Sequence, residues 1–350
     1  MVKFLKLLAG QLLFVALFMF TACKSDDVTP SKGAYESGVF ITCEGKFSGG
    51  TGTVSFYNRV KGGIKNNIFS LENNGAAVGN ILQSITVHEG NGYLVVNNAN
   101  KILIVDPYTF KYKDSIGGMI LPRYVLGADT KKAYVSEWGA NGVTGSVKVV
   151  DLATKKITKT ILTGSGAEKM LKIGNRLYVC NGGGFGSDST VAVIDTDNDV
   201  LLSKIQVGLN PSSIIADANG DIWVLSGGSF SRATGSNLVK IKGNIVVGTF
   251  DVPKYASNLV TNDTKNTLYY LASKSIWKKD IGTTTPSVFL TNTAFVTPYA
   301  LGFDAKSASL YMGDAKDYAS DGTLFVIDAT AVTVKDSVKI GIIPGGFSFN

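Results

Sequence analysis

Histidine, cysteine, proline and charged residues are all scarce in this chain. Its 350 residues include one His, three Cys and eight Pro, and charged residues make up 17%. A zinc site or a Ser-His-Asp triad would have to be built around His88, which lies where a strand is expected to run into a turn. Cys43 and Cys180 are too far apart in the sequence to form a metal motif, and we expect two separate buried thiols. We therefore predict no metal site, no cofactor and no enzymatic activity.

Runs of one charge and helical periodicity are also missing. The formal net charge is +7, but no run of five or six Lys and Arg exists, so nucleic acid is not an expected partner. No segment after residue 23 keeps a helical hydrophobic period with caps, so few helices are expected. The chain has instead a 45% hydrophobic share and 40 Gly, which favour a large core and many turns. These features predict an all-β fold.

The N-terminus has the layout of a bacterial lipoprotein signal. Lys3 and Lys6 precede an apolar stretch from Leu7 to Phe20, which is too short and too interrupted for a comfortable membrane span. It ends in Phe20-Thr21-Ala22-Cys23, which resembles a lipobox. We predict a signal peptide over residues 1–22, and an acylated Cys23 with its tether over residues 23–35. An ordinary signal peptide with an incidental Cys is the alternative.

The short acidic segment after Cys23 predicts where the protein resides. Lys24-Ser25-Asp26-Asp27 resembles the signal that sends some Gram-negative lipoproteins to the outer cell surface. We therefore expect an outer-membrane protein that faces the cell exterior and contacts the membrane through its lipid anchor only.

One phrase recurs through residues 36–350. An aromatic-bearing strand, such as Lys132-Ala133-Tyr134-Val135-Ser136, is followed by a loop and by an alternating strand that often ends in Asp. The distance from Asp106 to Asp151 is 45 residues, and from Asp151 to Asp195 it is 44. A period of this length that holds four short strands is typical of a β-propeller blade.

The number of blades follows from the predicted inner strands. Six of them begin near Leu82, Arg123, Ala167, Pro211, Ala256 and Pro298, and a seventh occupies residues 344–350. The N-terminal segment supplies three strands with no inner one, at residues 39–42, 53–57 and 64–69. The last strand is therefore predicted to complete the first blade and to close a seven-bladed β-propeller over residues 36–350. An open solenoid with a frayed end is the alternative.

Long loops on one face of this propeller carry the candidate site. The loops that join second to third strands are long in five blades, and they share a face with the loops between blades. Large aromatic side chains with a few polar groups are suited to a flat or bulky ligand. The candidate ligand-binding residues are Glu44, Lys46, Phe47, Arg123, Tyr124, Glu137, Trp138, Lys169, Asn181, Phe185, Phe230, Tyr255, Tyr299 and Tyr318.

Several segments also resemble a known family. The repeated strand pairs resemble YncE-like propellers with YVTN-type repeats, and residues 38–350 are similar to surface-lipoprotein propellers of the BtuG type. The matching pieces include Phe40-Ile41-Thr42-Cys43-Glu44-Gly45, Pro122-Arg123-Tyr124, Asp314-Ala315-Lys316-Asp317-Tyr318 and Gly341-Ile342-Ile343-Pro344-Gly345. The resemblance implies capture of cobalamin or a related corrinoid, and its handover to a TonB-dependent outer-membrane transporter. A protein- or glycan-binding propeller in another surface uptake complex is the alternative, and a propeller lyase or lactonase is a third.

Overall fold

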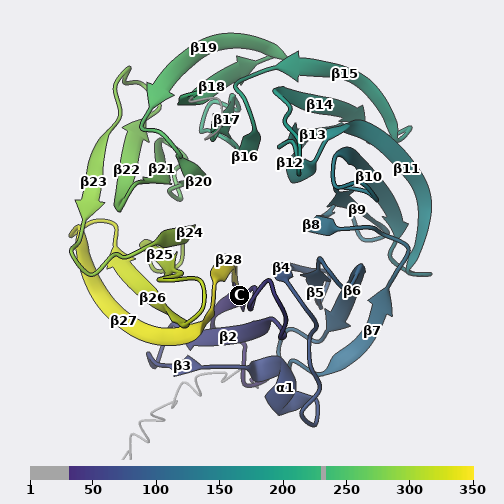
Figure 1. The fold of residues 1–350 in the computed structure, drawn as a ribbon, viewed down its shortest axis with the longest axis vertical. Coiled ribbons are helices and arrows are strands. Elements are labelled where there is room, and N and C mark those ends of the chain that lie inside the picture. The colour runs from purple at the N-terminus through teal and green to yellow at the C-terminus, as the bar shows by residue number, and fades with distance from the viewer. Residues whose placement is uncertain (1–30, 230–233) are drawn as a thin grey trace, which may run out of the picture. The chain divides into compact units, whose positions relative to one another are not determined.

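The computed structural model describes residues 31–229 and 234–350, and residues 32–350 form one compact unit. The predicted signal peptide over residues 1–22, the predicted lipidation site Cys23 and the candidate Phe230 lie outside the described residues. Seven four-stranded antiparallel sheets surround a central axis, which confirms the predicted seven-bladed β-propeller (Figure 1).

Each blade runs from an inner strand at the axis to an outer edge strand. From inside to outside, the strands are as follows. Blade 1 has β28 (Pro344–Phe349), β1 (Gly38–Cys43), β2 (Thr53–Asn58) and β3 (Ile64–Lys65); blade 2 has β4 (Leu82–His88), β5 (Asn91–Val96), β6 (Lys101–Val105) and β7 (Tyr112–Ile116). Blade 3 has β8 (Pro122–Gly127), β9 (Lys132–Glu137), β10 (Thr144–Asp151) and β11 (Lys156–Ser165); blade 4 has β12 (Ala167–Ile173), β13 (Arg176–Asn181), β14 (Thr190–Asp195) and β15 (Val200–Gln206).

The remaining three blades follow the same order. Blade 5 has β16 (Pro211–Ala216), β17 (Ile222–Ser226), β18 (Ser236–Lys242) and β19 (Ile245–Val252); blade 6 has β20 (Ser257–Thr261), β21 (Thr267–Ala272), β22 (Ser275–Asp280) and β23 (Ser287–Thr291); blade 7 has β24 (Pro298–Asp304), β25 (Ser309–Asp314), β26 (Asp321–Asp328) and β27 (Thr333–Ile342).

The core lies between the blades. Each of seven buried apolar clusters combines side chains from two neighbouring blades, so the sheets are stacked face to face around the ring. The second strands are covered on both sides, and in β13 only Arg176 is not fully buried. This burial explains their near-continuous apolar runs. Cys43 and Cys180 are buried in two different interfaces as free thiols, as predicted.

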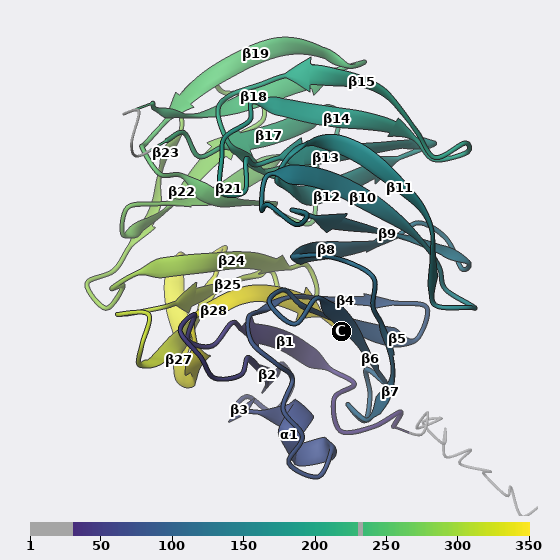
Figure 2. The same ribbon diagram turned by 45° about the vertical axis from the view of Figure 1, so that its right-hand side comes forward.

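The C-terminal strand closes the ring. β28 pairs antiparallel with β1, with Ile41 opposite Phe347 and Val39 opposite Phe349, and both ends of the propeller unit therefore lie in blade 1 (Figure 2). Arg59, just after β2, strengthens the closure: its Nε lies 2.5 Å from Asp304 Oδ2 of blade 7, and its Nη1 donates to the Asn350 carbonyl at 3.1 Å. The prediction that the C-terminal strand completes the first blade is confirmed.

One predicted strand is wrong in part. The segment 64–69 was expected to be a single strand, but β3 ends at Lys65 and a short helix, α1 (Ile68–Glu72), follows. Asn67 adopts the left-handed conformation (φ 53°) and so ends the extended backbone. The turn lets Ile68 and Phe69 pack together into the core between blades 1 and 2.

Candidate functional site

A bulge near the start of every inner strand aims side chains at the axis. Each inner strand loses register with its neighbour within its first residues, so one or two residues are left out of the ladder. A β-bulge of this kind bends the strand and redirects the extra side chain. The residues left out are Gln83, Arg123, Glu168 and Lys169, Ser212, Asn258 and Leu259, Tyr299, and Gly345.

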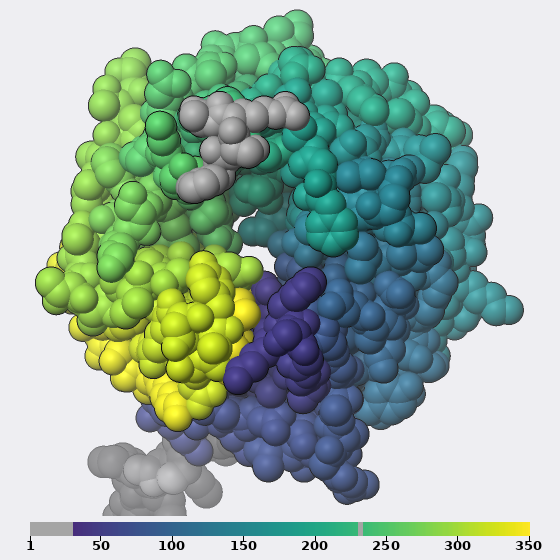
Figure 3. All heavy atoms as spheres, viewed as in Figure 1, coloured from purple at the N-terminus to yellow at the C-terminus, as the bar shows by residue number. Residues whose placement is uncertain are grey.

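All seven bulges supply residues to one cavity at the loop face. This cavity, which we call the funnel, has a volume of about 620 Å³. The loops after the second strands add further lining residues, including Glu44, Phe47, Trp138, Phe185 and Tyr318. The space-filling view of this face shows the hollow at the centre of the ring, bordered by the purple loop between β1 and β2 (Figure 3).

Left-handed residues fix the loops around the funnel. Five inner strands are directly preceded by a residue with positive φ, namely Ile81, Leu121, Gly166, Asn210 and Ile343. In all five blades the carbonyl of this residue accepts a hydrogen bond from the first backbone N–H after the second strand. Ile343 in this way holds Glu44 (2.8 Å), and Leu121 holds Trp138 (3.1 Å). Four of the five residues carry a Cβ, so the backbone here is strained.

One side of the funnel holds an ion pair supported by an indole. Arg123 Nε lies 3.0 Å from Glu168 Oε1, and its Nη1 donates to the side-chain carbonyl of Gln83. The guanidinium carbon lies 4.2 Å from the centre of the Trp138 ring, and Trp138 Nε1 donates to Glu168 Oε1 at 2.9 Å. Although burial disfavours the charged guanidinium, the carboxylate of Glu168 and other nearby groups raise the pKa of Arg123. The cluster joins blades 2, 3 and 4.

A second carboxyl group, that of Glu44, has weaker support. Its Oε1 accepts a hydrogen bond from the Tyr299 hydroxyl at 3.2 Å, and a Cβ at Gly345 would lie only 2.6 Å from the same atom. Burial raises the pKa of Glu44 to about 7, although Arg123 and Tyr299 favour its ionised form. Glu44 is therefore poised to exist in both protonation states near neutral pH, and any side chain at Gly345 would require the Glu44 carboxyl group to move.

Exposed aromatic rings surround the mouth of the funnel. Phe47 is 75% exposed, Phe185 71%, Tyr255 53% and Tyr318 49%, and they come from four different blades. Two of them rest edge-on against deeper rings: Phe185 against Trp138, with ring centres 5.3 Å apart, and Tyr318 against Tyr299 at 5.8 Å. Exposed rings gathered around one cavity mark a place where a large apolar face can bind.

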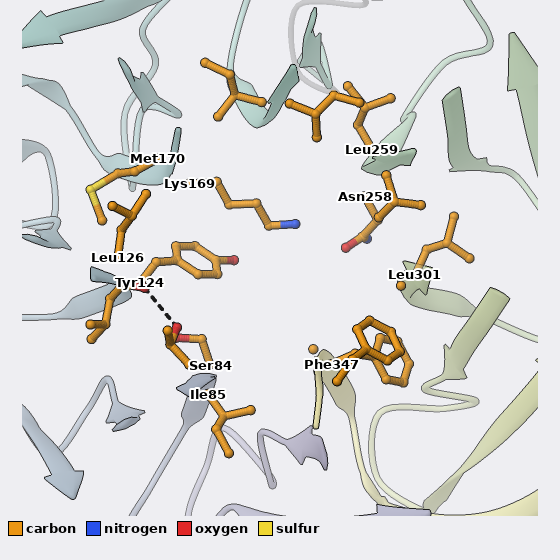
Figure 4. Close-up of a pocket in the computed structure, with 18 of the residues that line it drawn as sticks. Ser84, Ile85, Tyr124, Leu126, Lys169, Met170, Asn258, Leu259, Leu301 and Phe347 are labelled. Atoms are coloured by element: carbon orange, nitrogen blue, oxygen red, sulfur yellow. Dashed lines mark hydrogen bonds between the residues drawn. The ribbon is translucent and has the colours of Figure 1, made fainter. Parts of the chain in front are cut away.

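The funnel continues into a second cavity along the axis. This inner cavity has a volume of about 590 Å³ and shares Gln83, Tyr124, Lys169, Asn258 and Gly345 with the funnel, so these five residues form a neck between the two. The Lys169 ammonium, the Tyr124 hydroxyl and the Asn258 amide point toward the axis (Figure 4). Burial lowers the pKa of Lys169 and raises that of Tyr124.

Ten of the fourteen candidate residues line the funnel. They are Glu44, Phe47, Arg123, Tyr124, Trp138, Lys169, Phe185, Tyr255, Tyr299 and Tyr318. Lys46 lies in an exposed turn outside the lining, and Phe230 lies outside the described residues.

Two further candidates have structural roles instead. Glu137 and Asn181 end their second strands and are buried. Glu137 accepts hydrogen bonds from the Ser146 hydroxyl (2.7 Å) and the Ile120 N–H (2.8 Å), and Asn181 donates to Thr190 Oγ1 at 2.9 Å. Both side chains hold loops in place and do not face the funnel.

Several polar residues of the lining were not among the fourteen. They are Gln83, Asn97, Asn98, Glu168, Ser212, Ser213, Ser257 and Asn258. Most belong to the bulges or to the short loop after β5. Six inner strands have a polar or aromatic second residue, as in Leu82-Gln83 and Ala167-Glu168, but the sequence does not show that these residues leave the ladder. The described residues contain no group of three or more His, Cys, Asp and Glu placed to hold a metal ion. Nor does any helix in that part of the chain have the length and apolarity to cross a membrane.

Solved structures share this fold at low sequence identity. A quinonprotein alcohol dehydrogenase-like protein from Bacteroides thetaiotaomicron superposes with a TM-score of 0.67 at 16% identity, over 90% of this chain and 78% of that one. Hydrazine synthase from Kuenenia stuttgartiensis gives 0.65 at 15%, over 78% and 91%. A protein from Lactobacillus plantarum gives 0.69 at 13%, over 90% and 99%. At such identities the likeness shows the fold alone.

Comparison of the sequence itself gives a family. The family model described as "Domain of unknown function (DUF5074)" matches residues 37–340, which is nearly the whole propeller. No curated protein matches the chain.

Proposed function

We propose that the propeller of this chain, which belongs to the DUF5074 family, is a binding module and not an enzyme, and that it captures cobalamin or a related corrinoid in the funnel. In this proposal the protein is anchored through Cys23 at the outer surface of the outer membrane. It passes the corrinoid to a TonB-dependent transporter.

The observation that carries the proposal is the ring of exposed aromatic side chains around an amide- and hydroxyl-lined cavity. A corrinoid is a flat macrocycle edged with amide side chains. Its faces need aromatic contacts, and its edge needs groups that donate and accept hydrogen bonds. Phe47, Phe185, Tyr255 and Tyr318 offer the former, and Gln83, Asn98, Ser212 and Asn258 offer the latter. The resemblance to BtuG-type lipoproteins supports the same ligand class.

Calorimetric titration of the full chain in detergent with cyanocobalamin tests the proposal. We expect saturable binding of one corrinoid per chain, and a change in the corrinoid absorbance. Replacing one rim ring, as in Tyr318→Ser, should weaken binding about threefold to tenfold, because one aromatic contact is lost.

Tyr112→Ser is the matched control. Tyr112 is 48% exposed, nearly as much as Tyr318, but it lies on the outer strand β7. This variant should bind like the parent. Absence of binding at micromolar protein, or equal weakening by the two substitutions, contradicts the proposal. Binding of a glycan or a protein at the same rim, without a corrinoid, would support the alternative uptake function.

A further inference from the structure

The inner cavity differs in character from the funnel above it. Below the neck its wall is formed mainly by aliphatic and aromatic side chains of the inner strands, among them Ile85, Leu126, Leu259, Leu301 and Phe347. Figure 4 shows these side chains around the axis, together with the polar ends of Lys169, Tyr124 and Asn258. The cavity is therefore a mostly apolar tube with a cluster of polar groups at its neck.

A cation at the neck has no charged partner of its own. Within residues 31–229 and 234–350, no hydrogen bond or ion pair joins the Lys169 ammonium to another group. Its Nζ lies over the Tyr124 ring, 5.9 Å from the ring centre. The neighbouring carboxylate, Glu168, is engaged by Arg123 and Trp138. Lys169 is partly buried, so its ammonium has lost part of its hydration without gaining a paired anion. An anion that enters the tube would compensate this loss.

We infer that the inner cavity is a second ligand site, which binds an organic carboxylate with an unbranched apolar chain. The carboxylate lies at the neck, where the Lys169 ammonium and the Tyr124 hydroxyl donate to it. The chain extends down the tube between Leu301 and Phe347. The site stands apart from the corrinoid proposal, since it needs neither the rim rings nor the Arg123–Glu168 pair.

The ligand series decanoate, decanol and decyltrimethylammonium tests the inference on the unaltered full chain. Detergent micelles would compete with the protein for these ligands. The protein is therefore kept in a detergent whose micelles take up little decanoate, and a titration of the micelles alone is subtracted. Calorimetry should show that decanoate binds about tenfold or more tightly than decanol, since only decanoate pairs with the ammonium. Decyltrimethylammonium should not bind.

Lys169→Met provides the second test, and Lys172→Met is its matched control. Both variants lose one lysine from β12, but the Lys172 ammonium donates to the Gly174 carbonyl at 2.8 Å and lies outside the tube. Lys169→Met should remove the preference for decanoate over decanol, and Lys172→Met should keep it. Equal affinity of the parent for the acid and the alcohol, no binding of decanoate, or an unchanged preference in Lys169→Met would each overturn the inference.

Discussion

Two carboxyl groups of the funnel have opposite electrostatic situations. Glu168 accepts from both Arg123 and Trp138, so its negative charge is balanced where it lies. Glu44 has one neutral donor, the Tyr299 hydroxyl, and burial raises its pKa from 4.5 to about 7. The folded state therefore binds a proton at Glu44 that the unfolded state has already released. The charges around Arg123 are therefore paired, whereas the charge of Glu44 depends on the pH.

This difference predicts how stability depends on pH. Between about pH 4.5 and 7 the folded state holds more protons at Glu44 than the unfolded state, so this residue lowers stability as the pH rises. Glu44→Gln removes the effect. The free energy of unfolding of the variant, relative to the parent, should therefore increase by about 1 to 3 kcal/mol from pH 4.5 to pH 8. Urea denaturation at both pH values measures it.

Asp317→Asn is the control for this measurement. Backbone N–H groups of Ser320 and Ala319 lower the pKa of Asp317 to about 2, so the residue is ionised in both states above pH 4.5. Its relative stability should stay constant over the same interval. A Glu44→Gln difference that is flat, or that falls with rising pH, would refute the raised pKa.

At the scale of elements, five of the seven inner strands begin directly after a residue with a left-handed backbone. Ile81, with φ 57°, lies directly before β4, and its carbonyl accepts from the Asn97 N–H at 2.8 Å. A left-handed backbone is unfavourable for a β-branched residue, and it persists here because the hydrogen bond and the adjoining bulge demand it. The strained entry thus sets where the binding loop begins.

At residue 81 we predict that a glycine variant is more stable than an alanine variant, which reverses the usual order within a strand. Ile81→Gly should be more stable than Ile81→Ala by about 1 kcal/mol, because only glycine adopts positive φ without a steric cost. Ile85, in the regular part of the same strand, is the matched position, and there the alanine variant should be the more stable. Chemical denaturation of the four variants measures both differences. Alanine above glycine at residue 81 would mean that the entry is not strained.

The same elements show how far the sequence could be followed. Repeats such as the Tyr134 and Tyr178 strands predicted the blades, because a strand buried on both faces has a distinctive composition. The bulges could not be predicted, since a register shift depends on the neighbouring strand. Glu137 and Asn181 were predicted to lie in loops, but the ladder between the second and third strands extends to include them. Nor did composition show that Asn67 would end the extended backbone of β3.

At the scale of the whole molecule, the ring depends on its last strand. β28 covers β1, and Phe347 and Phe349 pack against Tyr311 of blade 7. Phe347 and Phe349 belong to the apolar cluster between blades 7 and 1, so this interface needs the strand in place. Closure is thus a property of all seven blades together.

Deletion of residues 344–350 should abolish the cooperative fold. The deletion exposes the edge of β1 and removes the packing between blades 1 and 7. We expect a loss of several kcal/mol, which is about half of the free energy of unfolding of an ordinary domain. Circular dichroism during heating and gel filtration would show a broad transition and aggregation. Deletion of residues 46–50, which are all exposed, is the control and should leave a sharp transition. A sharp transition in the C-terminal deletion would mean that the ring is stable when open.

The bulged positions of the inner strands have one more consequence. These residues take no part in the ladders, and all of them except Leu259 lie outside the apolar clusters that hold neighbouring sheets together. Substitution at Ser212 could therefore change what the protein recognises while the framework tolerates the change. With one such variable position for each sheet, new specificities can arise by exchanging a few side chains, and architecture and cargo can evolve almost independently.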